Sequence, residues 1–301
     1  MLKETERTLS QFGDLEPNVS FRNLTTFRVG GNARYVFYPR NIFGLTNAIS
    51  ICKQEGIPYK VLGNGSNILP SDDEYDGIII KLTRYFIDYY FDEETLHAQC
   101  GCSLIALSYK AMEQSLSGLE FANGIPATLG GALFMNAGAY KCEMSDVVQE
   151  VQVLVDDDVL WLNRDQCQFS YRSSIFQRHP EWTIVSCKLK LKKGDHAVIE
   201  QLVNNRREKR SSTQPLNFPS AGSTFRNPEG NFAWHYIDQI GYRGHKVGGA
   251  QVSEKHSNFI INTGNASAAD IRQLADEIRK KVKDQFNVDL IMEVEKFNWK
   301  E

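Results

Sequence analysis

Three turns and loops carry the side chains best suited to chemistry in this chain. The first, Gly63-Asn-Gly-Ser-Asn67, follows a short strand predicted at 58–62. Its backbone N–H groups, together with the Ser66 hydroxyl and the Asn67 amide, form a set of donors suited to a phosphate. A tight surface turn has the same composition, so both interpretations stay open on these residues alone.

Two further segments have the composition of substrate-contacting loops. Pro219-Ser-Ala-Gly-Ser-Thr-Phe-Arg-Asn-Pro228 places hydroxyl side chains before Phe225 and Arg226, and its prolines fix both flanks. Such a loop either holds a hydroxyl rigidly against a substrate or links two domains. Phe169-Ser-Tyr-Arg-Ser-Ser174 sets one arginine among small polar residues. That arginine suits a carboxylate or phosphate, or a surface ion pair.

A carboxylate near the end of the chain is a further candidate. Glu293 lies within the apolar stretch Leu290–Phe297, and we predict a strand from Val288 to Phe297. Alternation along a strand would put Glu293 and Glu295 on one face. The Glu293 carboxylate would then lie exposed at a sheet edge or point into a site.

The segment 118–140 is unusual because it is both apolar and rich in glycine. It holds five glycines and a single charged side chain, Glu120. Such a segment brings backbone close to another part of the protein or to a large bound cofactor, and its composition does not separate the two. Its middle, Ala127 to Met135, is predicted to form a buried helix.

The elements that would position these residues alternate between strand and helix. We predict strands at 35–39, 58–62, 77–82, 147–155 and 183–191, a hairpin partner at 89–100, and helices at 41–56 and 103–117. The character changes near Gly194, where a polar helix to about Lys209 and a loop to Gly222 place a domain boundary near 193–220. The rest is a compact α+β unit, with a helix at 234–240, a strand at 258–262 and a helix from the capping signal Ser267–Asp270 to about Phe286.

Composition excludes several classes of function. The 301 residues are 42% apolar and 24% charged, which is ordinary for a globular protein of one or two domains. A net charge of -3 gives no case for nucleic-acid binding. The charged start lacks the apolar core of a signal peptide, and no apolar run approaches the roughly 20 residues that span a bilayer.

The six cysteines and six histidines lack metal-ligand spacing. We therefore expect a cytoplasmic protein with reduced thiols, no metal, and no nucleic-acid or membrane partner. No GxGxxG or Walker lysine motif is present, which disfavours nicotinamide- and ATP-type folds.

Taken together, these segments resemble the UDP-N-acetylenolpyruvoylglucosamine reductase (MurB) family from about Asn23 to Phe297. The matching segments are Asn23–Gly31, Leu62–Asn67, Gly118–Pro126, Gly130-Gly131, Met135–Tyr140, Ser170–Ser174, Gln214–Leu216, Ser220–Phe225, Gly244–Gly249 and Lys255-His256. Their number and order make the resemblance specific. The absence of a long insertion in the last part resembles the compact, type II-like subtype.

The resemblance implies an α+β fold. An FAD-binding domain of the vanillyl-alcohol-oxidase (PCMH) type at 1–195 would be followed by a smaller α+β substrate-binding domain at 196–301. It also implies the family's reaction, in which NADPH reduces FAD and a hydride then reaches the enolpyruvyl double bond of UDP-N-acetylglucosamine enolpyruvate, giving UDP-N-acetylmuramate for peptidoglycan. We expect a monomer.

The resemblance also implies roles for individual residues. Arg172 and Glu293 would stabilise the enolic intermediate, and Ser223 would donate a proton to it. A hydroxyl suffices as the acid because an enolic carbon is strongly basic, and the arginine would stabilise charge developing nearby. The implied cofactor-binding residues are Arg28, Gly30, Gly63, Asn64, Gly65, Ser66, Asn67, Gly124, Ile125, Pro126, Gly130, Gly131, Asn136, Ala137 and Gly138. The implied substrate-binding residues are Tyr171, Arg226 and Lys255.

Two departures from the family pattern lie beside the expected flavin. Ala127 stands where Gly usually follows the Ile-Pro pair, and Lys141-Cys142 stands where Gly-Gly is usual. The methyl of Ala127 is tolerable unless a positive φ is required there.

Two other functions remain open. A flavin oxidase with the same FAD domain is disfavoured by the Ser223 loop, by the last domain, and by the lack of a histidine for covalent attachment. A silent paralogue that binds nucleotide sugar is disfavoured because all three catalytic residues are present.

Overall fold

The computed structural model of the chain describes residues 3–300 and divides into two compact units. The first unit comprises residues up to 17, 35–64 and 77–209, and the second comprises 18–34, 65–76 and 210–301. Both units are therefore assembled from separate stretches of chain. The predicted division at 195/196 concerns ligand-binding domains and remains a prediction.

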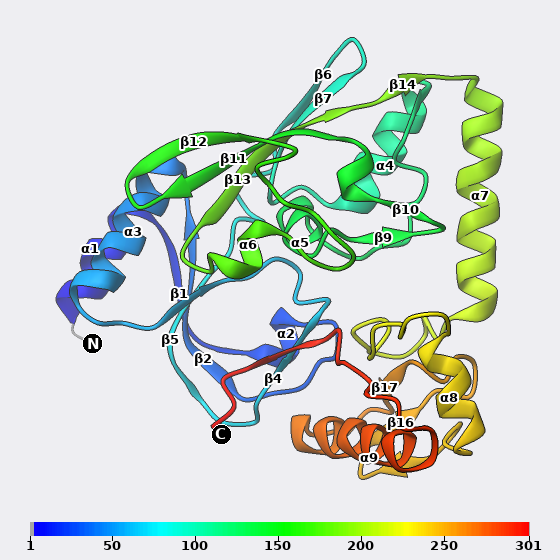
Figure 1. The fold of residues 1–301 in the computed structure, drawn as a ribbon. Coiled ribbons are helices and arrows are strands. Elements are labelled where there is room, and N and C mark those ends of the chain that lie inside the picture. The colour runs from blue at the N-terminus through cyan, green and yellow to red at the C-terminus, as the bar shows by residue number, and fades with distance from the viewer. Residues whose placement is uncertain (1–2, 301) are drawn as a thin grey trace. The chain divides into compact units, whose positions relative to one another are not determined.

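A five-stranded antiparallel sheet forms much of the first unit. Its strand order is β12-β11-β13-β7-β6, and β6–β7 and β11–β12 are hairpins (Figure 1). The strands are β6 (Tyr89–Asp92), β7 (Thr95–Gln99), β11 (Val148–Val155), β12 (Asp158–Asn163) and β13 (Thr183–Lys190). The alternation predicted for the strand at 183–191 is confirmed from Val185 to Lys190, where apolar side chains are buried and the polar side chains between them are not.

A second sheet has the strand order β1-β2-β5-β3. Its strands are β1 (Gly13–Ser20), β2 (Asn32–Pro39), β5 (Tyr75–Ile80) and β3 (Tyr59–Val61), with β3 and β5 parallel. Helix α3 (Ile42–Gln54) begins as predicted, because the Asn41 side chain accepts a hydrogen bond from the amide of Gly44 at 2.9 Å. Helix α1 (Lys3–Phe12) lies beside α3 (Figure 1).

Shorter elements complete the first unit. They are α4 (Leu104–Glu113), β8 (Leu116–Ser117), α5 (Leu129–Phe134), β9 (Gly138–Ala139), β10 (Cys142–Glu143), η1 (Met144–Asp146), α6 (Ile175–Arg178), β14 (Lys192–Lys193) and α7 (His196–Thr213), which runs past the unit's end. The buried helix predicted within 118–140 is α5, and its Thr128 cap accepts a hydrogen bond from the amide of Gly131 at 3.2 Å. Within residues 3–300, no helix is both long and apolar enough to cross a membrane.

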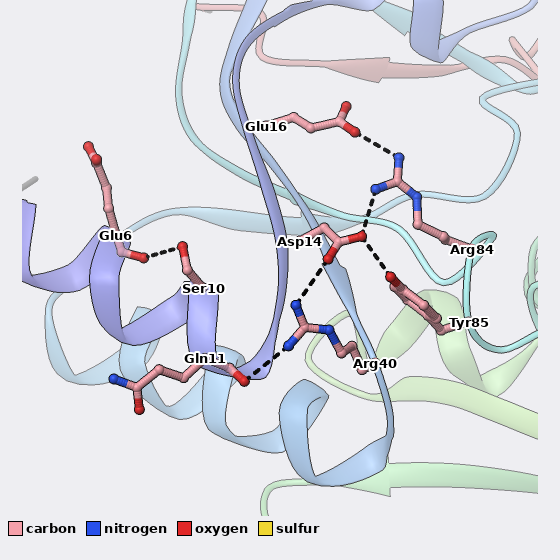
Figure 2. Close-up of polar contacts among 8 residues, drawn as sticks. All are labelled: Glu6, Ser10, Gln11, Asp14, Glu16, Arg40, Arg84 and Tyr85. Atoms are coloured by element: carbon pink, nitrogen blue, oxygen red, sulfur yellow. Dashed lines mark hydrogen bonds and ion pairs between the residues drawn. The ribbon is translucent and has the colours of Figure 1, made fainter.

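A polar network joins the start of β1 to two later parts of the first unit (Figure 2). The Asp14 carboxylate accepts hydrogen bonds from Tyr85 at 2.7 Å, Arg84 at 2.9 Å and Arg40 at 3.2 Å. Arg84 also donates to Glu16 at 2.7 Å. The bond from Tyr85, followed by that from Arg84, lowers the pKa of Asp14. The network therefore stabilises β1 while Asp14 is charged.

The second unit is a smaller α+β assembly. Its elements are α2 (Phe21–Leu24), β4 (Ile68–Pro70), α8 (Ala233–Gln239), β15 (Lys246–Val247), β16 (Ala250–Val252), β17 (Ile260–Asn262), α9 (Ala268–Phe286) and β18 (Glu295–Phe297). The capping box predicted at the start of α9 is confirmed, because Ser267 and Asp270 each accept the other's amide. Phe27, Val29 and Leu69 share the core into which α9 packs its apolar stripe.

The predicted strand from Val288 to Phe297 is wrong over most of its length. Only Glu295–Phe297 forms a strand, and it pairs in parallel with β4, so that Glu295 lies opposite Ile68. Upstream, Asn287 ends α9 in the left-handed conformation with a φ of 54°. The chain between these points makes one isolated antiparallel bridge, between Met292 and Phe225. Glu293 therefore owes its position to that bridge and not to alternation along a strand.

Candidate active site

Within the first unit, Gly63 and Asn64 at the start of the turn contact the Gly-rich segment 118–140. The Asn64 side chain donates a hydrogen bond to the carbonyl of Pro126 at 3.2 Å. A Cβ at Gly63 would collide with the hydroxyl of Thr128, so only glycine fits. Two segments that hold implied cofactor-binding residues are therefore in contact.

The same turn leaves hydrogen-bond donors available. Within residues 3–300, the backbone amides of Asn64, Gly65 and Ser66 donate to no protein acceptor. Gly65 adopts a φ of +61°, a conformation that glycine adopts readily. Consecutive free amides around a left-handed residue form a concave site for anions. The turn thus has the chemistry that the sequence predicted for it.

The amides at the start of α5 are already engaged by protein. The Gly130 amide donates to the carbonyl of Cys100 at 2.8 Å, and the Gly131 amide donates to Thr128. Gly130 therefore brings backbone close to another part of the chain, which is one of the two alternatives that composition left open, whereas Gly131 completes the cap of α5. Their predicted contact with a cofactor stays a prediction, as does that of Gly124 and Ile125.

Ala127 is accommodated without strain. It is buried, and it is not among the residues with positive φ in the described part of the chain. Its amide donates to the carbonyl of Ile125 at 2.8 Å, and its carbonyl accepts from Leu104 at 3.0 Å. The departure from Gly at this position therefore alters side-chain volume without distorting the backbone.

Arg172 lies at the tip of a tight turn. The backbones of Ser170 and Ser173 exchange two hydrogen bonds of 3.0 Å, which leaves Tyr171 and Arg172 at the tip. Arg172 has a φ of 54°, which is uncommon for a residue with a side chain. Its guanidinium donates to the carbonyl of Gly138 at 2.8 Å. A strained residue held this firmly is a frequent feature of functional sites.

Two amide side chains hold this turn in place. Asn136 is fully buried, and it donates to the carbonyl of Ser170 at 3.0 Å while accepting from the amide of Ser145 at 2.9 Å. Gln177 donates to the carbonyl of Arg172 at 3.1 Å. The side chain of Asn136, predicted to bind the cofactor, thus supports the Arg172 turn. Gln177 was not anticipated from the sequence, where nothing marks it apart from its place five residues after Arg172.

The hairpin of β9 and β10 has strained residues at its tip. Tyr140 and Lys141 have φ values of 57° and 63°, although neither is glycine. The Tyr140 hydroxyl donates to the carbonyl of Arg206 at 2.9 Å. The family pattern has glycines at this position. Lysine at position 141 is therefore accommodated at a conformational cost.

In the second unit, the Ser223 loop and Glu293 are neighbours. The amide of Glu293 donates to the carbonyl of Thr224 at 2.9 Å, and the amide of Arg226 donates to the carbonyl of Ile291 at 2.9 Å. On its other side the loop is held by the buried Asn258, whose side chain accepts from the amide of Phe225 at 3.0 Å and donates to its carbonyl at 2.8 Å. Two of the three predicted catalytic residues are thus brought together by backbone pairing.

The remaining predicted residues differ in how they are held. Within residues 3–300, the Nε of Arg226 is buried and has no hydrogen-bond partner, which suits a ligand with an anionic group. The Lys255 ammonium donates to the carbonyl of Ser211 at 2.5 Å, in the last turn of α7. Tyr171 is half exposed.

Five residues predicted to bind the cofactor belong by packing to the second unit: Arg28, Gly30, Gly65, Ser66 and Asn67. Asn262 donates to the carbonyls of Phe27 and Arg28, at 3.0 and 3.4 Å. The Asn67 side chain donates to the carbonyl of Glu293 at 3.0 Å. Asn67 therefore supports the segment that carries Glu293.

Comparisons with known proteins match most of the chain. Residues 33–161 match the family described as FAD binding domain, and residues 214–297 match UDP-N-acetylenolpyruvoylglucosamine reductase, C-terminal domain. The UDP-N-acetylenolpyruvoylglucosamine reductase of Anoxybacillus flavithermus is 39% identical over 284 residues, which cover 94% of this chain and 94% of the relative. The chain belongs to the UDP-N-acetylenolpyruvoylglucosamine reductase family.

Other members of this reductase family extend the similarity to structure. The relative from Caldanaerobacter subterraneus subsp. tengcongensis is 41% identical over 283 residues, 94% of this chain and 93% of the relative. The crystal structure of the reductase from Thermus caldophilus matches with a TM-score of 0.82 at 33% identity, covering 95% of this chain and all of that one. The predicted fold class, an FAD-binding domain followed by a smaller α+β domain, is confirmed.

The family matches cover some candidate residues and omit others. The FAD-binding match includes the Gly63–Asn67 turn and the segment 118–140. The C-terminal match includes Ser223 and Glu293, whereas Arg172 lies outside both matches. The turn's free amides suit the pyrophosphate of FAD, so the residues present fit the cofactor that the family binds.

Proposed function

We propose that this reductase-family chain catalyses the NADPH-dependent reduction of UDP-N-acetylglucosamine enolpyruvate to UDP-N-acetylmuramate. The protein would act as a monomer in the cytoplasm. Its product would serve the synthesis of peptidoglycan precursors. Family membership supports the reaction class, because the relatives carry this activity in their names. The observation that carries the proposal furthest is the backbone pairing of the Ser223 loop with Glu293.

The cofactor would be held chiefly by residues within the FAD-binding match, 33–161. The free amides of Asn64, Gly65 and Ser66 would bind the pyrophosphate, and the segments 124–126, 130–131 and 136–138 would line the rest, with Arg28 and Gly30. FAD, once bound and reduced by NADPH, would supply the hydride for the enolpyruvyl double bond. We assign FAD to the domain at 1–195 and the sugar nucleotide to the domain at 196–301.

The chain's own residues would handle charge and protons. Ser223 donates its hydroxyl proton to the enolic carbon, which is basic enough to take it if the geometry is tight. Arg172 and Glu293 stabilise the enolic intermediate, and the fixed turn that carries Arg172 keeps its guanidinium preorganised. Arg226, Tyr171 and Lys255 bind the substrate, and the unpaired Nε of Arg226 is suited to an anionic group.

One assay tests the proposal. The purified protein should be yellow and should oxidise NADPH only after UDP-N-acetylglucosamine enolpyruvate is added. A colourless protein that takes up no FAD would reject every flavin-dependent function. A yellow protein that reduces oxygen without the sugar nucleotide would favour a flavin oxidase. Binding of the sugar nucleotide without any turnover would favour a silent paralogue.

A further inference from the structure

A buried lysine contacts the first residue of the Gly63–Asn67 turn. Lys81 follows the apolar strand β5 and is 8% exposed. Its backbone amide donates to the carbonyl of Phe37 at 2.8 Å, and its ammonium donates to the carbonyl of Gly63 at 2.7 Å. All three residues belong to the first unit. The sequence carried a signal for this site, because a lysine interrupts the apolar run Gly77–Leu82.

The ammonium of Lys81 has donors to spare. Lysine carries three N–H donors, and within residues 3–300 the Gly63 carbonyl is its one hydrogen-bond acceptor. It forms no ion pair in that part of the chain. A buried cation without a counter-ion is costly unless an anion binds close to it. The location therefore calls for an anionic ligand at the turn.

Electrostatics of the surrounding elements point the same way. Burial alone lowers the pKa of Lys81 to about 8. Nearby titratable groups, Tyr38 on β2, Lys60 on β3 and Arg84 in the loop after β5, do not contribute to this shift. The charge of Lys81 is therefore free to respond to a ligand, and it titrates in an accessible pH range.

We propose that Lys81 is a positioning residue for the cofactor, because it holds the Gly63 carbonyl inward and adds positive charge to the start of the turn whose amides receive the FAD pyrophosphate. With the carbonyl held inward, an acceptor oxygen is kept away from the phosphate oxygens, which it would repel. The free amides of Asn64 to Ser66 are then left as the donors at that surface. This inference rests on the proposed binding of FAD.

The affinity for FAD tests the inference without any measurement of turnover. Holoprotein is diluted in steps, and the fluorescence of released FAD gives the dissociation constant at pH 7 and pH 9. Lys81→Met keeps the aliphatic stem and removes the charge, whereas Lys81→Arg keeps a cation that does not titrate. Lys192→Met, at an exposed lysine of the same unit, is the matched control.

Four results are expected. The wild type should bind FAD several-fold more weakly at pH 9 than at pH 7. The loss of affinity should not exceed about tenfold, because the pKa of Lys81, about 8, lies one unit below pH 9. Lys81→Met should bind about tenfold more weakly at pH 7 and show no such pH dependence. Lys81→Arg should lose the pH dependence but keep most of the affinity. Lys192→Met should match the wild type.

Equal FAD affinity in Lys81→Met and the wild type, with equal pH dependence, would overturn the inference. So would a Lys81→Met protein that melts at a lower temperature but binds FAD normally, since Lys81 would then be only a structural support. If Lys81→Met does not fold, the pH dependence of the wild type and its absence in Lys81→Arg decide. If no preparation binds FAD at either pH, the proposed function fails, and not merely the role of Lys81.

Discussion

The amide of Glu293 donates a hydrogen bond to the carbonyl of Thr224 at 2.9 Å, and Thr224 directly follows Ser223. The bond joins main-chain atoms, so it survives a substitution of either the Ser223 or the Glu293 side chain. Changes at these two positions should therefore remove chemistry while leaving the loop in place. That property makes mutational tests of the proposed roles direct.

Ser223→Ala should separate the two half-reactions. Reduction of bound flavin by NADPH should stay near the wild-type rate, because the hydroxyl has no part in it. Reoxidation by UDP-N-acetylglucosamine enolpyruvate should slow by about 10²- to 10⁴-fold, the usual contribution of a general acid. Stopped-flow absorbance of the flavin measures both steps.

Ser220→Ala is the matched control for that experiment, since it removes a hydroxyl three residues upstream in the same loop. Both half-reactions should remain near normal in this variant. If Ser223→Ala instead slows reduction and reoxidation equally, Ser223 has a structural role and another group donates the proton.

Asn258→Ala should disturb the Ser223 loop indirectly. Asn258 is 3% exposed, and its side chain satisfies both the amide and the carbonyl of Phe225. Leaving these two buried groups unpaired should cost about 1–3 kcal/mol for each. Thermal unfolding should begin at a lower temperature, and reoxidation by substrate should slow more than flavin reduction does.

Asn262→Ala provides the comparison, because Asn262 is also buried but its side chain bonds to Phe27 and Ala266. It should lower stability without a selective loss of reoxidation. Normal reoxidation in a destabilised Asn258→Ala would show that Asn258 supports the fold and not the geometry of Ser223.

Lys141→Gly should stabilise the protein. A residue with a side chain pays about 1–2 kcal/mol in the left-handed region, and Lys141 has a φ of 63°. The added freedom of glycine in the unfolded chain returns about 0.5–1 kcal/mol of this. A small rise in melting temperature is therefore expected by calorimetry. Lys141→Ala removes the same charge but keeps the strain, so a rise of equal size in that variant would contradict the explanation.

The Asp14 network should make stability depend on acidity. The pKa of Asp14 lies below its ordinary value of 3.8, chiefly because of the bond from Tyr85. A lowered pKa means that the charged carboxylate stabilises the fold above about pH 4 and that this contribution is lost as the pH falls through the folded value. Asp14→Asn should therefore be less stable than the wild type in urea at pH 7, and the difference should shrink at pH 3.

Asp76→Asn is the control for this network, because Asp76 pairs with Arg34 while remaining largely exposed. Its substitution should change stability little at either pH. A constant difference between Asp14→Asn and the wild type from pH 7 to pH 3 would show that the charge of Asp14 does not stabilise β1.

Local signals in the sequence predicted local structure well. Asn41 and Ser267 marked two helix starts because a capping side chain acts within three residues of itself. The alternation at 183–190 marked a strand because one face of it is buried. The family pattern marked the Ser223 loop, and the glycines at 63 and 65 marked the cradle.

Pairings over long distances in the sequence were beyond such signals. The strand at 295–297 pairs with β4, more than two hundred residues earlier, and no periodicity in either segment encodes that partner. Without it, the apolar stretch before Phe297 looked like one strand, and the register of Glu293 was derived wrongly. The role of Asn258 was equally hidden, because its partner Phe225 lies 33 residues away. A residue whose role depends on such a distant partner can be identified only from the folded structure.

The discontinuity of the second unit has a consequence for how the protein is made. Phe27, Val29 and Leu69 emerge early from the ribosome, but the core that covers them contains residues as late as Val294. β4 likewise lacks its partner until Glu295–Phe297 has been synthesised. At a synthesis rate of about 5–20 residues per second, the delay between the synthesis of β4 and that of β18 lasts roughly ten to forty-five seconds. During this interval an apolar stretch and an open strand edge need protection, so the nascent chain should depend on chaperones more than the finished enzyme does.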